Sequence, residues 1–252
     1  MVLAMHKCWA NGHGECSDKI SREHLISSGI FEDQSILIGG HPWCQGREKK
    51  ISVASLTTKT LCTKHNSAMS PLDDEGINAV RLFEQFFPDN MKSNHKAPFK
   101  DIINGHMFER WLLKTAINNS VKSDLHIGIG MSDSSPGKPS PYLLAVVFGE
   151  LQFTHQMGLY VIGNSAPISL TAGQITIIPV HKDGNVGGFY FHIRGLSFFL
   201  SLYPGHSVPS LKNLGMTESI GIHKEFLDSE PLYRPSCINV IDEHSAPQQL
   251  TF

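Results

Sequence analysis

Four residues limit what the first third of the chain can fold into: Cys8, Cys16, Cys62 and His65. Structural Zn²⁺ sites in proteins are built from four Cys or His ligands arranged as a tetrahedron. Cys62 and His65 have two residues between them, a spacing at which two side chains reach the same ion. The sequence therefore predicts a structural zinc that ties the N-terminus to the segment near residue 65. Because such a site rarely exists in an unfolded chain, its binding free energy would contribute directly to folding.

The first cysteine pair leaves the ligand set open at one position. Seven residues separate Cys8 from Cys16, which is wider than the usual Cys-x-x-Cys spacing. Either His6 or His13 can therefore replace one of these two cysteines. We keep the four-residue set as the prediction and these two histidines as its alternatives.

The cysteine count also indicates a compartment. The chain has five cysteines in 252 residues, and an odd number argues against the disulfide framework of a small secreted protein. The opening residues MVLAMHKCW have no useful apolar stretch before Lys7, so we expect no signal peptide. No apolar run approaches the length that spans a bilayer. These features predict a cytoplasmic protein without a membrane partner.

Composition and charge restrict the function classes. Hydrophobic residues make up 40% and charged residues 17%, which is typical of a globular protein with a sizeable core. A net charge of −2 is not that of a general nucleic-acid binder, so any nucleic-acid surface must be local. The candidate for such a surface is the most basic segment, residues 47–64, and the alternative is that it is an ordinary solvated face. Its cations, which face only Glu48, are Arg47, Lys49, Lys50, Lys59 and Lys64.

Two helices are expected in the middle of the chain. Ser70 suits a helix N-cap, Pro71 suits the first helical position, and Asp73 suits the acid of a capping box. This helix should end near residue 87, before Pro88. A second amphipathic helix should follow Asn104-Gly105 and end near Asn118-Asn119. The apolar positions at helical spacing are Ile77, Val80, Phe83 or Glu84, and Phe87 in the first helix, and Phe108, Trp111, Leu112 and Ala116 in the second.

The rest of the chain indicates strands. A strand is expected at 36–38 and another within 51–61, and from residue 125 onward the pattern becomes β-rich. Asp183-Gly184-Asn185 is a hairpin turn signal. Segments 91–101 and 132–141 should be loops, and the tail from about Pro204 should be irregular. The expected later strands are 142–148, 151–162, 174–180, 189–193 and 195–202.

Three ordered motifs, CWANGHGEC, ISREHLIS and LCTKHNSAMSPLD, together resemble the HNH nucleases of the ββα-metal fold. The resemblance covers about residues 5–75. It implies a two-stranded hairpin and a helix that clamp one divalent ion, pinned by a zinc between paired knuckles. The predicted fold class is therefore α+β: a zinc-pinned ββα-metal unit at 1–88, a helical connector at 89–124, and a β-rich domain with an irregular tail at 125–252.

The resemblance also implies roles for single residues. His24 would be the general base that takes a proton from the attacking water, and Glu23 a metal ligand or orienting group. Asn66 would hold His24 or its loop by hydrogen bonds. Asp73 would complete the site of a catalytic Mg²⁺ or Mn²⁺, which stabilises charge on the phosphate. Two neighbours that can take the place of Asp73 in this role are Asp74 and Glu75.

The chain departs from the family pattern at three points. Pro71 lies between Asn66 and Asp73, which argues against one continuous helix. Ser27 stands where the family usually has a proline after its Glu-His segment, and His65 replaces the last cysteine of the knuckle. The helix-start signal also gives Asp73 a purely structural alternative role as a capping residue.

Two functions of different classes follow. The first is a metal-dependent endonuclease, a hydrolase that cuts phosphodiester bonds of DNA. The alternative is a zinc-stabilised, catalytically degenerate module that binds nucleic acid or regulates. In either case the β-rich domain would be available for assembly with a second copy or with a partner protein.

Overall fold

The protein combines helices and strands, with its strands in several small sheets. The computed structural model describes residues 7–86, 102–128, 136–154, 157–162, 175–182, 185–202, 232–233, 237–240 and 248–251. The predicted loop at 91–101 lies outside the described residues. Most of the predicted irregular tail also lies outside them. No helix in the described ranges is both long and apolar enough to cross a bilayer.

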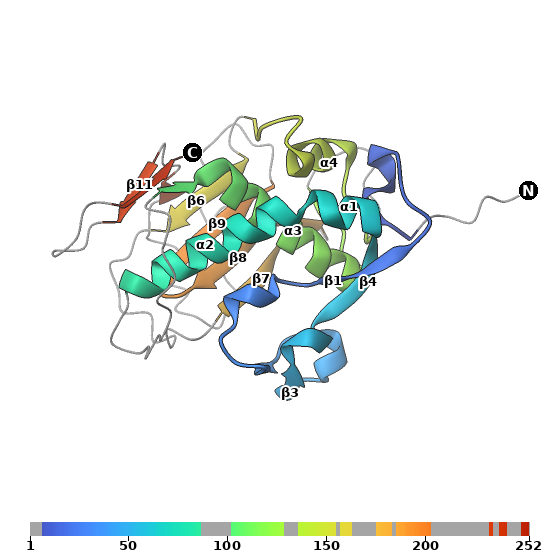
Figure 1. Ribbon diagram of the computed structural model, residues 1–252, viewed down its shortest axis with the longest axis horizontal. Helices are drawn as coiled ribbons and strands as arrows, with labels where there is room; N and C mark the ends of the chain where they lie inside the picture. The colour runs from blue at the N-terminus through green and yellow to red at the C-terminus, as the bar shows by residue number, and fades with distance from the viewer. Residues whose placement is uncertain are drawn as a thin grey trace, which may run out of the picture.

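The N-terminal part is built on a pair of strands that are far apart in the sequence. Strand β1 (Ile20–His24) pairs antiparallel with β4 (Thr57–Cys62), and helix α1 (Thr63–Ala68) follows β4 directly. The register shifts between Ser21 and Glu23, so β1 carries a bulge shortly before its last residue, His24. A short 3-10 helix, η1 (Trp9–His13), precedes β1. Figure 1 shows this pair on the side nearest the N-terminus.

The chain between β1 and β4 forms a small projecting ribbon. Strands β2 (Ser35–Ile38) and β3 (Lys49–Ser52) pair antiparallel, which confirms the strand predicted at 36–38. The segment predicted to contain one strand, 51–61, contributes to both β3 and β4. The short 3-10 helices of this part are η2 (Ser28–Ile30), η3 (Pro42–Cys44) and η4 (Val53–Ser55).

The two predicted central helices are present. Helix α2 (Ser70–Phe86) agrees with the predicted limits, and Met69 separates it from α1, so the chain does not form one continuous helix through Pro71. Helix α3 (Gly105–Ser123) starts at Asn104, whose side chain accepts a hydrogen bond from the backbone N–H of Met107 at 3.1 Å. It runs about one turn beyond the predicted end.

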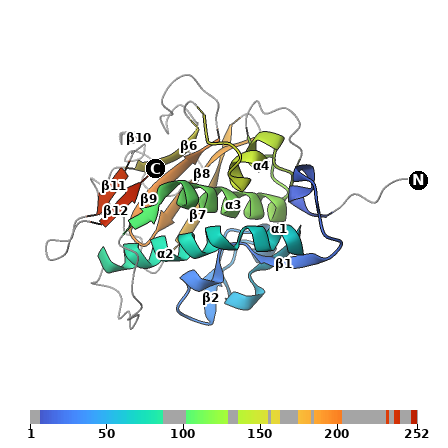
Figure 2. The ribbon, with the colours of Figure 1, turned by 45° about the horizontal axis from the view of Figure 1, so that its top comes forward.

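Helix α3 is not amphipathic, which corrects the prediction. Its side chains are buried almost all the way round, because α2 lies along one side and the large sheet along another (Figures 1 and 2). The rings of Phe83 in α2, Phe108 in α3 and Phe198 in the sheet meet with centroids 5.5–5.7 Å apart. This aromatic group joins the three layers. A single-sequence pattern of apolar positions cannot show that polar positions on the same helix are buried too.

The β-rich part forms a sheet with strand order β10-β6-β9-β8-β7, all antiparallel. Strands β7 and β8 pair up to Lys182 and Asn185, which brackets the predicted hairpin turn. A separate sheet has the order β11-β12-β5, with β5 parallel to β12. The bounds are β5 (Ile102–Asn104), β6 (Gly158–Ile162), β7 (Ile175–Lys182), β8 (Asn185–Ile193), β9 (Leu196–Ser201), β10 (Leu232–Tyr233), β11 (Cys237–Val240) and β12 (Gln248–Thr251).

The strand predicted at 142–148 is wrong: this segment is helix α4 (Pro141–Phe148). Ser140 caps the helix by accepting a hydrogen bond from the N–H of Leu143 at 3.3 Å, and Pro141 occupies the first turn. Gly149 ends it with a positive φ of 81°. A short apolar run suits a buried helix as well as a strand, and here the caps decide. Of the strand predicted at 151–162, only β6 is present, from Gly158 onward.

One hydrophobic core connects the described elements from η1 to β9. Buried side chains form a continuous cluster from Trp9 at the N-terminus, through Leu112 in α3, to Leu200 in β9. Arg194, after β8, donates from Nη2 to the carbonyl of Ile30 at 3.3 Å and so links the sheet to η2. The domain boundaries at 88 and 124 stay predictions, and the core runs across both of them.

Candidate functional site

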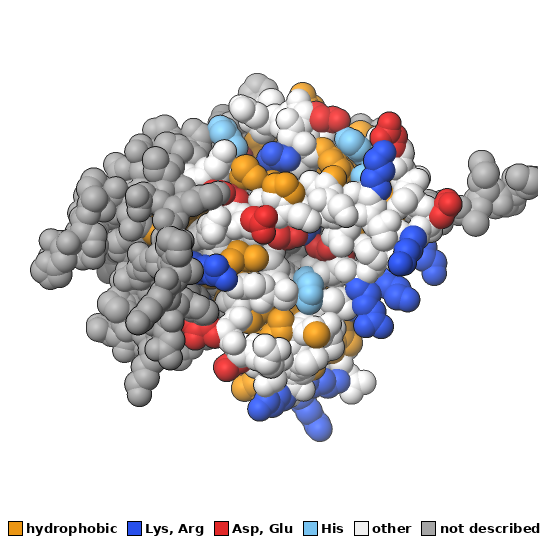
Figure 3. All heavy atoms as spheres, in the orientation of Figure 1, with side chains coloured by type: hydrophobic (Ala, Val, Ile, Leu, Met, Phe, Trp, Pro, Cys, Tyr) orange, Lys and Arg blue, Asp and Glu red, His pale blue; other side chains and the backbone are white. Residues whose placement is uncertain are grey.

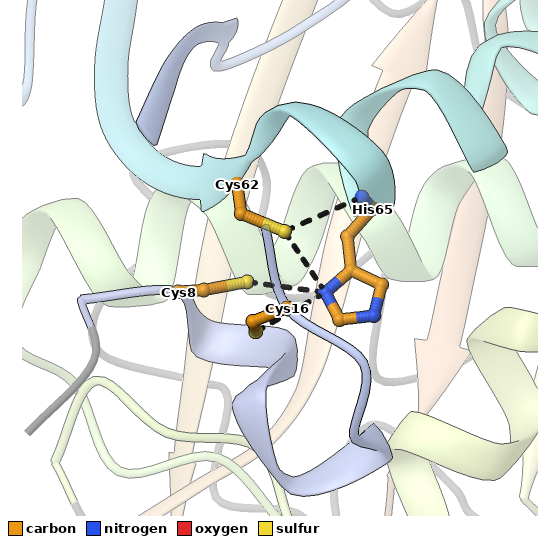
Figure 4. A group of neighbouring side chains, drawn as sticks. All are labelled: Cys8, Cys16, Cys62 and His65. Atoms are coloured by element: carbon orange, nitrogen blue, oxygen red, sulfur yellow. Dashed lines mark hydrogen bonds between the residues drawn. The ribbon is translucent and has the colours of Figure 1, made fainter. Parts of the chain in front are cut away.

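The four predicted zinc ligands come together. Cys8 precedes η1, Cys16 precedes β1, Cys62 ends β4 and His65 lies in α1 (Figure 4). Their ligand atoms all lie within 4.8 Å of one another. The Nδ1 atom of His65 is 3.4 Å from the Sγ of Cys8, 3.6 Å from that of Cys16 and 3.4 Å from that of Cys62. A tetrahedral zinc with normal bond lengths places nitrogen and sulfur about 3.6 Å apart. The cluster can therefore hold a metal such as zinc.

The start of α1 sets the geometry of Cys62 and His65. Cys62 is the N-cap residue, and its Sγ accepts a hydrogen bond from the backbone N–H of His65 at 3.5 Å. The same turn that begins the helix thus aims both side chains at one point. Cys8 has the corresponding position before η1. Two helix starts from opposite ends of the motif region face each other across the cluster.

The environment affects the cysteine thiols differently. Burial raises the pKa of Cys8 to about 12. Burial also raises the pKa of Cys62, but hydrogen bonds from the backbone of His65 and from Ser17 outweigh it, and the pKa falls to about 7. A metal bound here takes the cysteines as thiolates, so its binding releases protons and weakens as the pH falls.

The alternative ligand His13 lies beside the cluster and has other partners. Its ring stacks on Phe148 with centroids 3.9 Å apart, and its Nε2 lies 2.8 Å from the carboxylate of Glu150. Phe148 also meets the ring of His65 edge-on at 5.3 Å. The end of α4 therefore covers the cluster. The other alternative, His6, lies outside the described residues.

A second cluster of polar groups lies next to the predicted catalytic residues. Glu23 and Asp73 both bind the ammonium group of Lys114, a residue of α3 that the sequence patterns did not single out. The Nζ atom is 2.6 Å from Oε1 of Glu23 and 2.7 and 2.6 Å from the two carboxylate oxygens of Asp73. Burial raises the pKa of Glu23, and the nearby ammonium opposes this shift. We call Glu23, Asp73 and Lys114 the lysine cluster.

Further residues of α3 support the lysine cluster. Trp111 donates from Nε1 to the Oγ of Ser27 at 2.8 Å, and Ser27 donates to Asp73 at 2.6 Å. Asn118 donates to Oε1 of Glu23 at 3.4 Å and to the carbonyl of His24 at 3.0 Å. Positions 111, 114 and 118 lie on one face of the helix. The sequence signal that could have identified these residues is a lysine and an asparagine at helical spacing among apolar residues.

The same contacts explain one departure from the family pattern. Ser27 is 6% exposed and uses its hydroxyl both to accept from Trp111 and to donate to Asp73. A proline at this position would have no hydroxyl for either bond. The carboxylate of Asp73 is directed at these partners, and no capping bond by its side chain is seen in the described structure.

His24 lies at the end of β1, opposite Thr57. It is partly exposed, and burial lowers the pKa of its imidazole, while the nearby Asp73 acts in the opposite direction. Its Nδ1 atom is buried and has no hydrogen-bond partner among the described residues, although the Leu56 backbone lies near enough to favour the charged form. Asn66, on α1, is also partly exposed.

The structure does not bring the predicted ion ligands together as an open site. In the described part of the chain, only the Cys/His cluster brings three or more Cys, His, Asp or Glu side chains close enough to share an ion. Of the two alternative acids, Asp74 is exposed, and buried Glu75 accepts from the backbone N–H of Asn104 at 2.6 Å. Glu23 and Asp73 remain predictions as ligands of a divalent ion.

Exposed cations collect around the β1–β4 pair. Arg22 lies on β1, and Lys59 lies on β4 beside the bulge. Figure 3 shows Lys and Arg side chains along this side of the molecule and at the tip of the β2–β3 ribbon. A hollow of about 200 Å³ lies between the ribbon and the body, with Trp43, Leu56 and Lys122 in its wall. The exposed cations on the two strand pairs or within two residues of them are Lys19, Arg22, Arg47, Lys50, Lys59 and Lys64.

Comparisons with known proteins identify no relative. No family model matches the chain, and neither a curated protein nor a solved structure does.

Proposed function

We propose that the chain is an HNH-like endonuclease that hydrolyses phosphodiester bonds of DNA, with His24 as the general base. The support begins with architecture. An antiparallel strand pair leads directly into a helix, and a Cys/His cluster ties both to the N-terminus. The resemblance to the ββα-metal nucleases implies a two-stranded hairpin followed by a helix, and the β1–β4 pair with α1 is compatible with such a unit, although residues 25–56 separate its strands.

The observation that carries the proposal is the state of His24. A general base must be neutral before it accepts a proton, and burial lowers the pKa of this imidazole. Among the described residues the buried Nδ1 of this ring has no hydrogen-bond partner, and the side chain is partly exposed at the end of β1. In the proposed reaction, His24 takes the proton from a water molecule as the water oxygen attacks phosphorus; the P–O bond to one ester oxygen breaks, and that leaving oxygen takes a proton from solvent.

The surface around His24 suits a nucleic-acid backbone. Arg22 and Lys59 are exposed on the two strands that carry the site, although the net charge of the whole chain is −2. Phosphate contacts by such residues supply most of the affinity of proteins for nucleic acid and make it dependent on salt. The basic surface is local, as the composition requires.

The catalytic Mg²⁺ or Mn²⁺ implied by the resemblance does not fit the Glu23–Asp73 pair as it stands. The carboxylate oxygens that would bind it are already bound to the ammonium of Lys114. When bound, such an ion would stabilise charge on the phosphate.

Lys114 also favours the second candidate function, a zinc-stabilised and catalytically degenerate module that binds nucleic acid or regulates. In such a module the former ion site would serve only to hold the fold, and an internal ammonium does that. The basic surface and the Cys/His cluster belong equally to this candidate.

Cleavage of supercoiled plasmid and of single-stranded RNA separates the two candidates. Zinc-loaded protein is incubated with Mg²⁺ or Mn²⁺, beside His24→Ala and the control His181→Ala, which changes an exposed histidine on the far sheet. Cleavage by the wild type and the control, lost in His24→Ala, supports the nuclease. Salt-dependent binding without cleavage supports the module. A protein that neither cleaves nor binds nucleic acid contradicts the nuclease and the nucleic-acid-binding form of the module.

A further inference from the structure

We infer that Lys114 is the resident cation of the Glu23–Asp73 site and that it excludes a divalent ion from it. The inference rests on the geometry of three side chains. It holds whether the chain cuts nucleic acid or only binds it.

The ammonium group is fully used. A lysine has three N–H donors, and the Nζ of Lys114 lies within 2.7 Å of three carboxylate oxygens. One belongs to Glu23 in β1, and two belong to Asp73 in α2. The lysine therefore fills, from α3, the place between two acids that a metal ion would otherwise take. A divalent ion can bind both acids only by displacing it.

Burial makes such a displacement costly. The side chain of Lys114 is 2% exposed and that of Glu23 is 7% exposed, whereas that of Asp73 is 27% exposed, so the lysine is enclosed even where one acid is not. A lysine moved out of these contacts would have to find other partners in a dry interior or lose its proton. Mg²⁺ also keeps several of its waters and requires near-octahedral geometry, which a closely packed acid pair does not provide.

The packing of α2 on α3 fixes the lysine in place. A Cβ atom at Gly76, one turn after Asp73 in α2, would lie 2.3 Å from the ring of Trp111. The missing side chain therefore lets the two helices approach closely, which brings Asp73 within reach of Lys114. Trp111 and Asn118 donate to Ser27 and Glu23 on either side, so both carboxylates are also held by neutral donors.

The test is a Mn²⁺ titration of zinc-loaded protein by calorimetry and by electron paramagnetic resonance. The wild type should show no Mn²⁺ site that depends on Asp73, so its titration should match that of Asp73→Asn. Lys114→Ala frees both carboxylates and leaves room for waters. It should gain one equivalent of bound Mn²⁺, and Lys114→Ala/Asp73→Asn should lose it again.

Zinc content and near-ultraviolet circular dichroism show whether each variant is folded. Lys122→Ala, which removes an exposed lysine of the same helix, is the matched control and should behave as the wild type. Lys114→Met serves as a second variant that keeps more of the buried volume. If neither Lys114 variant folds, the comparison of wild type with Asp73→Asn decides.

Two results would overturn the inference. One is a Mn²⁺ site in the wild type that disappears in Asp73→Asn, because the ion then displaces the lysine. The other is a folded Lys114→Ala or Lys114→Met protein that gains no Mn²⁺. Neither result depends on cleavage, so the proposed nuclease can fail while this inference stands, and the reverse.

Discussion

The Cys/His cluster and the lysine cluster are two buried polar centres that hold the same strand pair in different ways. The first joins Cys8, Cys16, Cys62 and His65, all within the first 65 residues, and presents donors that suit a metal ion. The second joins β1, α2 and α3 and contains its own cation. The first centre can therefore take a metal ion from outside, whereas the second has its cation when the chain has folded.

The two centres show two ways in which buried polar groups can be paired. The sulfur and imidazole donors of the first centre lie within 4.8 Å of one another, and a metal ion bound there would contribute folding free energy. Acids that meet a lysine need no ion, but each partner becomes costly to remove, because a buried charge is then left uncompensated.

Loss of the metal should have the largest effect. Cys62→Ser and His65→Ala should remove about 10 kcal/mol of binding free energy, which is comparable to the whole stability of a typical domain. We expect the N-terminal part to unfold and bound zinc to be lost, as measured by elemental analysis and circular dichroism. The control Cys44→Ala changes a buried cysteine outside the cluster and should cost only about 1 kcal/mol. Zinc retained at one equivalent in His65→Ala would contradict this assignment.

Removal of the internal cation should cost less. Lys114→Met leaves two carboxylates without their partner and should lower the free energy of unfolding by about 3–5 kcal/mol in denaturant titrations. The triple variant Glu23→Gln, Asp73→Asn, Lys114→Met carries no buried charge at this point and should regain most of that loss. A loss below about 0.5 kcal/mol, as expected for a surface change, would mean that the cluster does not stabilise the fold.

The hydrogen bond that supports the lysine cluster should have a smaller effect. Trp111→Phe keeps most of the ring but removes the N–H that binds Ser27, and should cost about 1 kcal/mol. In a double-mutant cycle with Ser27→Ala, the coupling energy should be at least about 0.5 kcal/mol. Additive losses in this cycle would show that the bond contributes nothing of its own.

A buried histidine that belongs to neither centre gives the smallest expected effect. His192 is 1% exposed, and burial lowers the pKa of its ring. The unfolded chain therefore binds more protons in the window between this lowered value and the ordinary 6.5, so stability rises with pH across the window and is lost as the pH falls. The slope from one group is at most about 1.4 kcal/mol per pH unit.

His192→Gln should flatten this slope by up to one proton, as measured by unfolding at pH 5 to 8. The remaining slope should come from other histidines with lowered pKa values, among them His24 and His41. An unchanged slope in His192→Gln would mean that this ring is protonated in the folded protein as readily as in the unfolded chain.

Features that depend on local spacing or on local signals could be predicted from the sequence. The ligands of the Cys/His cluster, the limits of α2, the break near Pro71 and the hairpin between β7 and β8 were all predicted. Each depends on residues a few positions apart or on ligand chemistry that few residue types can provide. Helix α4 was missed because its apolar run suits a strand equally well, although Ser140 and Gly149 carried the cap signals.

The partners of Glu23 and Asp73, in contrast, depend on how the helices and strands pack together. Glu23 and Asp73 have chemistry that suits a metal ion, a cap or a salt bridge, and nothing in their spacing selects among these. Lys114 stands 41 residues beyond Asp73, and it reaches both acids because α2 and α3 pack closely at Gly76 and Trp111. A buried charge is costly unless it is paired. Which partner it meets depends on the packing of the whole chain, not on any one segment.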